Sequence, residues 1–154
     1  MNALNQIRQN IHKLDLKKLA IAGTDHILIE MPYVPWDPWV YDELFKISAK
    51  HVLDIVIAHV DRYYGVVKKD SIQDLLDMNF KYQVNLDDLK SGIIKSPAIK
   101  LLKRGIANFI GSDCHNMTTR VPILATKTDE IRKKLGNEMF DKCMKNAEQM
   151  FSGM

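Results

Sequence analysis

Short apolar runs alternate along this chain with segments in which apolar residues recur every three or four positions. The runs have the length of buried strands and are bounded by turn-forming or polar residues; they cover residues 26–30, 52–59, 80–85 and 106–111. Helical spacing covers residues 39–49, 71–78, 87–104 with a break at 92–97, 121–135 and 138–151. Continuous apolar runs are typical of parallel strands covered on both faces. The alternation therefore predicts an α/β fold, a parallel sheet with outer helices.

The first 22 residues precede the first predicted strand and are expected to form a lead-in helix or loop, because their apolar residues recur at nearly helical spacing. Local signals bound two later helices. Ser71 suits an amino-terminal cap, and Gly105 suits the position just after a helix. With 154 residues the chain has the length of one domain, and we expect residues 1–154 to form it.

Each predicted strand is followed by polar side chains that can bind a metal or move a proton, namely Glu30, His59, Asn85, and Asp113 with His115. The carboxyl ends of parallel strands meet at one edge of the sheet, so we expect these side chains to gather there. Asp113 and His115 are separated by one residue, which in an extended segment places both on the same side of the chain. A carboxylate beside an imidazole is a metal-ligand or acid–base arrangement.

A simpler interpretation of that last stretch is that Asp113 caps the next helix and His115 lies in solvent. The stretch alone does not separate the two interpretations. Four successive strand ends with possible ligands favour the site.

Composition and charge narrow the function classes. Apolar residues make up 46% of the chain and charged residues 27%, as in ordinary soluble domains. The net charge is +3 without a basic run, so we expect no nucleic-acid partner. No apolar stretch has the length of a membrane helix or a signal core, so we expect a cytoplasmic protein without membrane contact. Cys114 and Cys143 lie far apart, which favours a reduced compartment over a disulfide scaffold.

The candidate ligands are carboxylates and imidazoles, which suit zinc, manganese, iron or nickel. Arg62 follows His59 by three residues and Arg120 follows His115 by five, which adds two guanidinium groups at the same edge. The planar guanidinium matches the oxygens of a phosphate. Metals that activate water beside phosphate-binding arginines are the components of a phosphoesterase.

A competing motif overlaps this stretch. Cys114 and Arg120 fit the Cys-x5-Arg pattern of cysteine-dependent tyrosine phosphatases, in which a thiolate attacks phosphorus. The loop lacks the glycines that such a phosphate cradle favours, and Asp113 disfavours the thiolate. Five nearby aromatic residues can either line a substrate pocket or pack the loops onto the fold; they are Tyr33, Trp36, Trp39, Tyr63 and Tyr64.

Four blocks of the sequence, in order and at compatible spacings, resemble the bacterial manganese-dependent protein-tyrosine phosphatases of the polymerase-and-histidinol-phosphatase (PHP) superfamily, found in capsule and exopolysaccharide operons. The blocks are Ile27-Leu-Ile-Glu30-Met-Pro, Ile57-Ala-His59-Val-Asp-Arg62-Tyr, Gln83-Val-Asn85 and Gly111-Ser-Asp113-Cys-His115-Asn-Met-Thr-Thr-Arg120-Val-Pro. Lys145-Asn-Ala-Glu-Gln-Met-Phe resembles the closing helix of that family. The likeness extends from about residue 25 to the end.

The resemblance implies a distorted (β/α)7 TIM-like barrel with up to three metal ions, manganese or another divalent metal such as iron or zinc. It implies hydrolysis of phosphotyrosine on a cognate bacterial tyrosine kinase by a metal-bound hydroxide. Carried over by position, the metal ligands are Glu30, His59, Asp113 and His115, and the phosphate-binding residues are Arg62 and Arg120. Asp113, His115 and both arginines would then be the catalytic residues.

The sequence departs from the family at its beginning. The family starts with a strand that carries His-x-His, a pattern that this sequence lacks. By the plan of the family, roughly the first third of the barrel is missing and only four ligands remain. We therefore expect a partial barrel: a truncated form, a remnant with an impaired site, or a half-barrel completed by another chain, with exposed edges that favour self-association. The alternatives are a non-catalytic domain that binds phosphoproteins and an enzyme acting on histidinol phosphate.

Overall fold

The computed structural model describes residues 9, 15–85, 96–118, 121–122 and 124–152. Within these residues, four parallel strands form one sheet in chain order, namely β1 (His26–Ile29), β2 (Asp54–Ile57), β3 (Lys81–Asn85) and β4 (Phe109–Gly111). Since every connection between neighbouring strands is a parallel crossover, all carboxyl ends lie at the same edge. The α/β class and the parallel sheet that the sequence predicts are confirmed.

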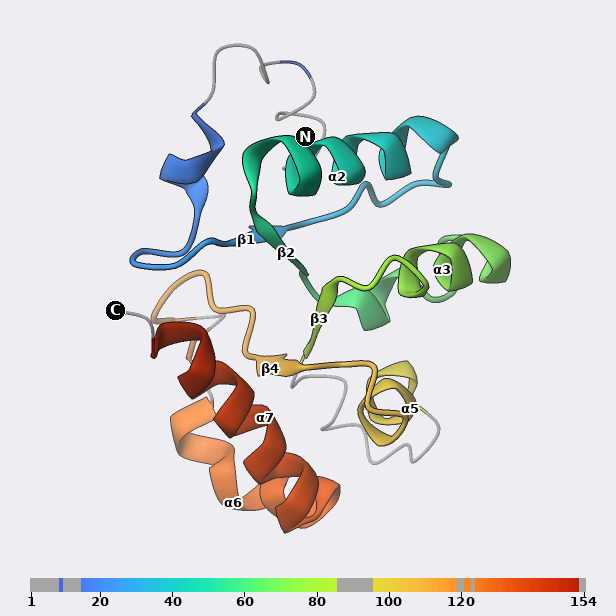
Figure 1. The fold of residues 1–154 in the computed structure, drawn as a ribbon. Coiled ribbons are helices and arrows are strands. Elements are labelled where there is room, and N and C mark those ends of the chain that lie inside the picture. The colour runs from blue at the N-terminus through green and yellow to red at the C-terminus, as the bar shows by residue number, and fades with distance from the viewer. Residues whose placement is uncertain (1–8, 10–14, 86–95, 119–120, 123, 153–154) are drawn as a thin grey trace.

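The helices lie outside this sheet, and the described ones are α2 (Pro38–His51), α3 (Lys69–Leu76), α5 (Pro97–Lys103), α6 (Leu124–Leu135) and α7 (Asn137–Phe151), with short 3-10 helices η1 (Leu16–Leu19) and η2 (Val60–Tyr63). Helices α2, α3 and α5 follow one another along the sheet, while α6 and α7 pack as a pair beside β4 (Figure 1). The sequence did not predict η2, which shapes the site described below.

Local chemistry explains most of the helix boundaries. Pro97 occupies the first turn of α5, and the Ser96 side chain accepts a hydrogen bond from the Ile99 backbone N–H at 3.2 Å. Gly105 has φ +69° and donates to the Leu102 carbonyl at 2.8 Å, so it follows the helix as expected. The prediction for Ser71 is wrong. Helix α3 begins at Lys69, after Lys68, and its first turn contains the acidic Asp70, whose charge is favourable at a helix amino terminus.

Alternation along the strands builds the core. Strand register pairs Ile27 with Ile55 and Ile29 with Ile57, and all four side chains are buried in the main hydrophobic cluster together with Leu44 of α2. Each such side chain contributes about 1.5–3 kcal/mol on burial. The same register brings the residues that follow β1 and β2 out of the sheet side by side, which positions the site.

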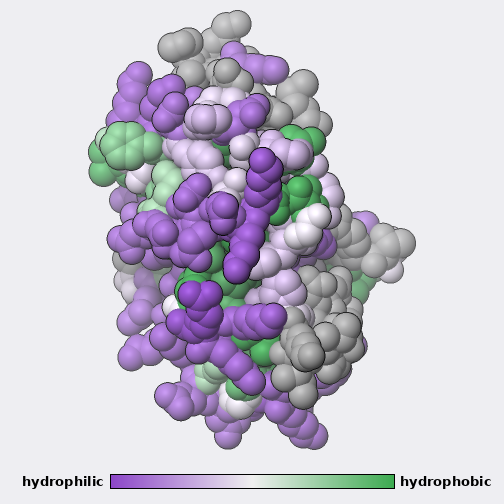
Figure 2. Space-filling model, turned by 90° about the vertical axis from the view of Figure 1, so that its right-hand side faces the viewer, coloured by the Kyte–Doolittle hydropathy of each residue, from purple (hydrophilic) through white to green (hydrophobic). Residues whose placement is uncertain are grey.

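Some predictions lie outside the described residues. These are most of the lead-in helix before residue 15, the segment 86–95 with its expected helix break, and Arg120. In the described part of the chain no helix combines the length and apolar character needed to span a membrane. The face drawn in Figure 2 carries mainly hydrophilic side chains, with hydrophobic ones in small separate areas.

Candidate functional site at the carboxyl edge of the sheet

The residues that follow β1, β2 and β4 line one cavity of about 530 Å³. Its lining consists of Leu28, Glu30, Ala58, His59, Arg62, Gln83, Gly111, Asp113, Cys114 and His115. The structure therefore brings together five of the six residues that the sequence singled out as ligands or phosphate-binding groups. The sixth, Arg120, lies outside the described residues.

Glu30 and His59 form the first pair of possible ligands. Glu30 Oε1 lies 3.7 Å from His59 Nε2, with the carboxylate exposed and the imidazole buried. Burial lowers the pKa of His59, and the nearby guanidinium of Arg62 lowers it further. The buried Nδ1 of His59 makes no hydrogen bond to any described residue. A buried imidazole that is kept neutral is in the protonation state in which histidine binds metals.

Asp113 and His115 form the second pair. Asp113 Oδ1 lies 3.0 Å from His115 Nε2, so the predicted meeting of these side chains is confirmed. The geometry differs from the alternation of an extended strand, because Asp113 has φ +49° and lies in the left-handed region. The interpretation of Asp113 as a helix cap is wrong, since α6 begins only at Leu124. His115 is largely exposed, with Asp113 beneath it.

Arg62 connects to the second pair. Its Nη1 donates to Asp113 Oδ2 at 2.6 Å, which is a charge-assisted contact. Arg62 lies in η2, a turn that begins because His59 has φ +34° and ψ +52°. Asp61 of this turn is buried, and its Oδ1 accepts a hydrogen bond from the Asn85 backbone N–H at 3.1 Å. The turn thus directs Asp61 into the protein and Arg62 toward the cavity.

Sequence reasoning missed the role of Gln83. Its Oε1 accepts a hydrogen bond from the His59 backbone N–H at 2.7 Å, and its Nε2 donates to the Val84 carbonyl at 2.7 Å. The available signal was a polar residue in the middle of the predicted third strand, on the face opposite the buried Val84.

The Asn85 amide lies between Gln83 and the arginine. With one orientation of this amide its oxygen accepts from Gln83 Nε2 at 3.0 Å; with the other it accepts from Arg62 Nη2 at 2.9 Å and Nε at 3.2 Å. Either way, Asn85 contacts both residues. Of the strand-end residues that the sequence indicated, Asn85 therefore supports the site from below and does not line its cavity.

The two pairs fit a divalent metal in their chemistry. Carboxylate oxygen and imidazole nitrogen are ligands for manganese, iron and zinc, and the unpartnered Nδ1 of His59 leaves an imidazole atom available. The pairs remain separate, however. Among the described residues no three His, Cys, Asp or Glu side chains are grouped closely enough to hold one ion. The chemistry of these residues therefore suits them to contribute to a metal centre.

The cysteine of the competing Cys-x5-Arg motif and two of the nearby aromatic residues can also be located in the structure. Cys114 is exposed in the cavity lining, with Sγ 3.7 Å from the Asn116 carbonyl, and its distance to Arg120 lies outside the described residues. Trp36 and Tyr63 are buried, with ring centroids 5.3 Å apart, and neither lines the cavity. For these two aromatic residues the packing interpretation is confirmed.

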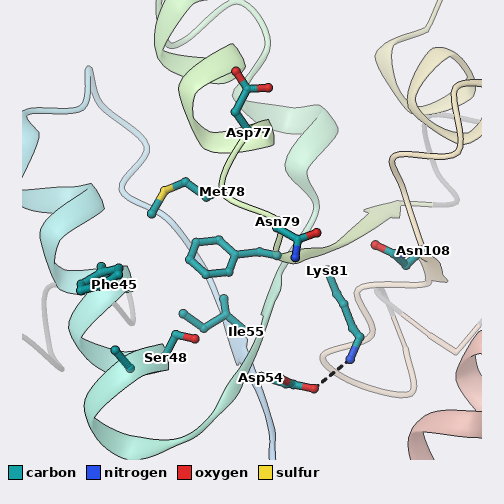
Figure 3. A pocket seen from close by; sticks show the side chains of 11 residues that line it. Phe45, Ser48, Asp54, Ile55, Asp77, Met78, Asn79, Lys81 and Asn108 are labelled. Carbon is teal, nitrogen blue, oxygen red and sulfur yellow. Dashed lines mark hydrogen bonds and ion pairs between the residues drawn. The ribbon is translucent and has the colours of Figure 1, made fainter.

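A larger cavity, of about 830 Å³, lies at the opposite edge of the sheet, where Asp54 and Lys81 begin β2 and β3 (Figure 3). Lys81 Nζ lies 3.0 Å from Asp54 Oδ2 and 2.6 Å from His26 Nε2. These groups contact one another as a cluster, in which the buried Nδ1 of His26 has no hydrogen-bond partner among the described residues. Because ligands of parallel α/β sheets bind at the carboxyl ends of the strands, the smaller cavity is the candidate site.

Comparisons with known proteins show the family of this chain. The sequence matches the family described as "Capsular polysaccharide synthesis, CpsB/CapC" over residues 4–152. The tyrosine-protein phosphatase CpsB of Streptococcus pneumoniae is 30% identical over 90 residues, which are 53% of this chain and 37% of that protein. CpsB of Streptococcus agalactiae is 26% identical over 138 residues, covering 83% of this chain and 56% of the relative. YwqE of Bacillus subtilis is 25% identical over 148 residues, covering 93% and 57%.

The fold has a solved counterpart. A chain among the crystal structures of YwqE from Bacillus subtilis and CpsB from Streptococcus pneumoniae, described as metal-dependent tyrosine phosphatases, superposes with a TM-score of 0.72 at 23% identity. The match covers 97% of this chain and 61% of that one, which confirms the PHP-type α/β fold. This chain spans about half the length of the curated relatives it matches. The match over residues 4–152 shows that the chain belongs to the CpsB/CapC family of capsular polysaccharide synthesis.

Proposed function

We propose that this chain is a metal-dependent phosphoesterase of the protein-tyrosine-phosphatase type, which hydrolyses phosphotyrosine on a protein. The observation that carries the proposal is one cavity lined by two carboxylate–imidazole pairs and a guanidinium group. The named relatives are tyrosine-protein phosphatases, and the solved ones are described as metal-dependent, which supports the same reaction class here.

Glu30, His59, Asp113 and His115 would hold the metal, and we propose manganese as the preferred ion, with iron or zinc as substitutes. A divalent metal bound there supplies a water of lowered pKa and polarises a phosphoryl oxygen. The positive charge of such a metal would offset the negative charge of the incoming phosphate. Before phosphate binds, the carboxylates would offset the charge of the metal.

Arg62 binds the phosphate through its planar guanidinium, together with Arg120. The contact with Asp113 at 2.6 Å restrains Arg62 before substrate arrives, so little side-chain freedom is lost on binding. His115 is the exposed member of its pair and can carry a proton to or from the leaving tyrosyl oxygen.

The same proposal includes the substrate protein and the cellular compartment. The substrate is a phosphotyrosine protein, with a bacterial tyrosine kinase of capsule synthesis as the natural candidate, and the chain acts in the cytoplasm as one domain of residues 1–154. Self-association is also part of the proposal, because Leu28, Tyr33 and Val34 are exposed apolar side chains on β1 and just after it.

Binding of phosphotyrosine without turnover is the second candidate. It is favoured by one observation, that the two ligand pairs in the described part of the chain stay separate. In that case Arg62 would still hold the phosphate group while the hydrolytic water is absent.

Phosphate release from a tyrosine-phosphorylated peptide, with manganese and then with a chelator, tests the proposal. We expect turnover that the chelator abolishes and that Cys114→Ser leaves within about twofold of the starting value, because the nucleophile is a metal-activated water. Histidinol phosphate serves as the competing small substrate. Peptide binding without phosphate release would instead establish the second candidate, and loss of activity in Cys114→Ser would establish the cysteine mechanism.

A further inference from the structure

Gln83 lies between the two carboxylate–imidazole pairs of the candidate site. It lies in β3, between the strand that leads to His59 and the strand that leads to Asp113. Its side chain lines the same cavity as the two ligand pairs, although it is neither a carboxylate nor an imidazole. It is also the side chain that receives the backbone N–H of His59, at 2.7 Å.

That hydrogen bond stabilises an unusual backbone conformation at His59. His59 has φ +34° and ψ +52°, a left-handed conformation that residues with a Cβ rarely adopt. Such a conformation persists where surrounding contacts specify it. Here the Gln83 acceptor fixes the N–H of His59, and the His59 carbonyl accepts from the Arg62 backbone N–H at 2.9 Å. The direction of the imidazole and the start of the turn that carries Arg62 therefore depend on one carboxamide.

The carboxamide itself is fixed in orientation. Its oxygen faces the N–H of His59 and its nitrogen faces the Val84 carbonyl at 2.7 Å, so exchanging the two atoms would break both hydrogen bonds. On its other side the group contacts Asn85, which in turn lies against the guanidinium of Arg62. Gln83 is thus linked to both ligand pairs, to His59 directly and to Asp113 through Asn85, whose Oδ1 accepts from Gln83 Nε2 at 3.0 Å and whose Nδ2 donates to Asp113 Oδ2 at 3.4 Å.

Gly111 of β4 makes room for this arrangement. A Cβ built on Gly111 would lie 2.6 Å from Gln83 Nε2, a distance that real Cβ atoms essentially never show, and 3.1 Å from Cδ, which is tighter than most real contacts, so the Gln83 side chain would have to move. Gly111 is not among the described glycines with positive φ, so its backbone can accept alanine. The absence of a side chain at this strand position is therefore explained by the approach of Gln83.

We propose that Gln83 is the positioning residue that sets His59 and couples the two ligand pairs, and that Gly111 is required because Gln83 occupies the space of its side chain. The proposal rests on the proposed function, since it assigns how the same site is held in its working geometry. The proposal also makes a prediction that would not hold if Gln83 and Gly111 only stabilised the fold. Gly111→Ala harms the site only while Gln83 is present.

The test is a double-mutant cycle of the full chain with Gln83→Ala, Gly111→Ala and the double variant. Three readouts are measured: Mn²⁺ affinity by calorimetry, the imidazole ¹⁵N signals of His59 by NMR in metal-free protein, and phosphate release from a tyrosine-phosphorylated peptide. Each single variant is expected to lower Mn²⁺ affinity or turnover by about 10- to 100-fold, the usual effect of removing a group that orients a ligand. Each is also expected to shift the His59 signals.

The decisive result is the double variant. We expect it to match Gln83→Ala alone in all three readouts, because the atom that collides with the new Cβ is gone. Gln73→Ala is the matched control, since Gln73 is an exposed glutamine whose amide donates to Asp77 at 2.8 Å and which does not line the cavity. It is expected to leave all readouts within about twofold, as is usual for exposed positions.

Losses that multiply in the double variant, or His59 signals that do not move in Gln83→Ala, would overturn the proposal. A starting protein that binds Mn²⁺ but releases no phosphate would reject the proposed function alone, and the affinity and NMR cycles would still decide the role of Gln83. If the starting protein binds no Mn²⁺ either, the NMR cycle decides it. Thermal unfolding of each variant shows that the comparison is made on folded protein.

Discussion

The two edges of the sheet hold similar groups in different states. At the amino edge, His26, Asp54 and Lys81 contact one another directly, so a histidine, a carboxylate and a cation form one cluster, in which the buried Nδ1 of His26 has no hydrogen-bond partner among the described residues. At the carboxyl edge, the buried Nδ1 of His59 is likewise without a partner among the described residues, and the difference lies in the backbone, because both His59 and Asp113 are left-handed.

The left-handed residues near the amino edge differ in kind. Val52 is a strongly exposed residue that ends α2, and Asn79 lies in the turn before β3. There the conformation serves chain reversal, as helix ends commonly require. At the carboxyl edge it orients possible ligands. Backbone strain at residues with chemically capable side chains is typical of a functional site, whereas His26, Asp54 and Lys81 form their cluster on regular strand backbone, which is typical of a structural one.

Removing one cation from each edge tests this contrast with the largest expected effect. Arg62→Ala should lower the rate of phosphate release by about 10²- to 10³-fold, because a charged donor to the phosphate is lost. Lys81→Ala should leave the rate within about twofold, since within the described part of the chain the Lys81 ammonium bonds to His26 and Asp54 of the amino edge. Steady-state kinetics on a tyrosine-phosphorylated peptide measures both. A Lys81 effect as large as that of Arg62 would remove the distinction between the edges.

A second experiment examines how much the buried hydroxyl of Tyr63, close to the carboxyl edge, contributes to the free energy of unfolding. The Tyr63 hydroxyl accepts a hydrogen bond from the Met31 backbone N–H at 2.8 Å and is fully buried, and burial raises its pKa. Tyr63→Phe leaves that N–H unpaired, so we expect a loss of about 1–3 kcal/mol in the free energy of unfolding. Denaturant titration measures it. Tyr33→Phe is the control, exposed and expected within about 0.5 kcal/mol. Equal effects would contradict the assigned role of the buried hydroxyl.

The smallest effect concerns pH at the amino edge. Burial lowers the pKa of His26 below its ordinary value of 6.5, and the Lys81 ammonium lowers it further. The unfolded chain then binds the proton more readily, so His26 makes the folded state less stable as pH falls from about 6.5 through the lowered value. His26→Gln should flatten this part of the stability profile, measured by thermal unfolding at several pH values. Because the pKa of His59 is also lowered, part of the slope should remain. An unchanged slope would contradict the role of His26.

The sequence pattern predicted the parts of this fold that depend on local spacing. Apolar runs located all four described strands, and the strand ends carried the residues that line the cavity. The start of α3 was missed because the helix extends to Lys69 with Asp70 in its first turn, so the capping preference of Ser71 did not decide the boundary. Propensity is a weak guide to such a boundary.

The support of the site was harder to predict. The link from Gln83 to the His59 backbone joins residues 24 positions apart, and the closeness of Gly111 to Gln83 depends on strand register. The left-handed backbone of Asp113 also has no signature in residue type alone, although Asp adopts it more readily than most residues. Periodicity records which face a residue occupies, and it does not record which atoms meet there.

The aromatic packing beneath the site has an optical consequence. Trp36 is buried, its indole N–H donates to the Pro32 carbonyl at 2.9 Å, and its ring lies 5.3 Å from Tyr63, which lies 5.7 Å from the imidazole of His59. One of the two tryptophans of the chain is therefore a fixed fluorophore two rings away from a proposed ligand. Its emission gives the protein a built-in signal for events at the cavity, without any attached label.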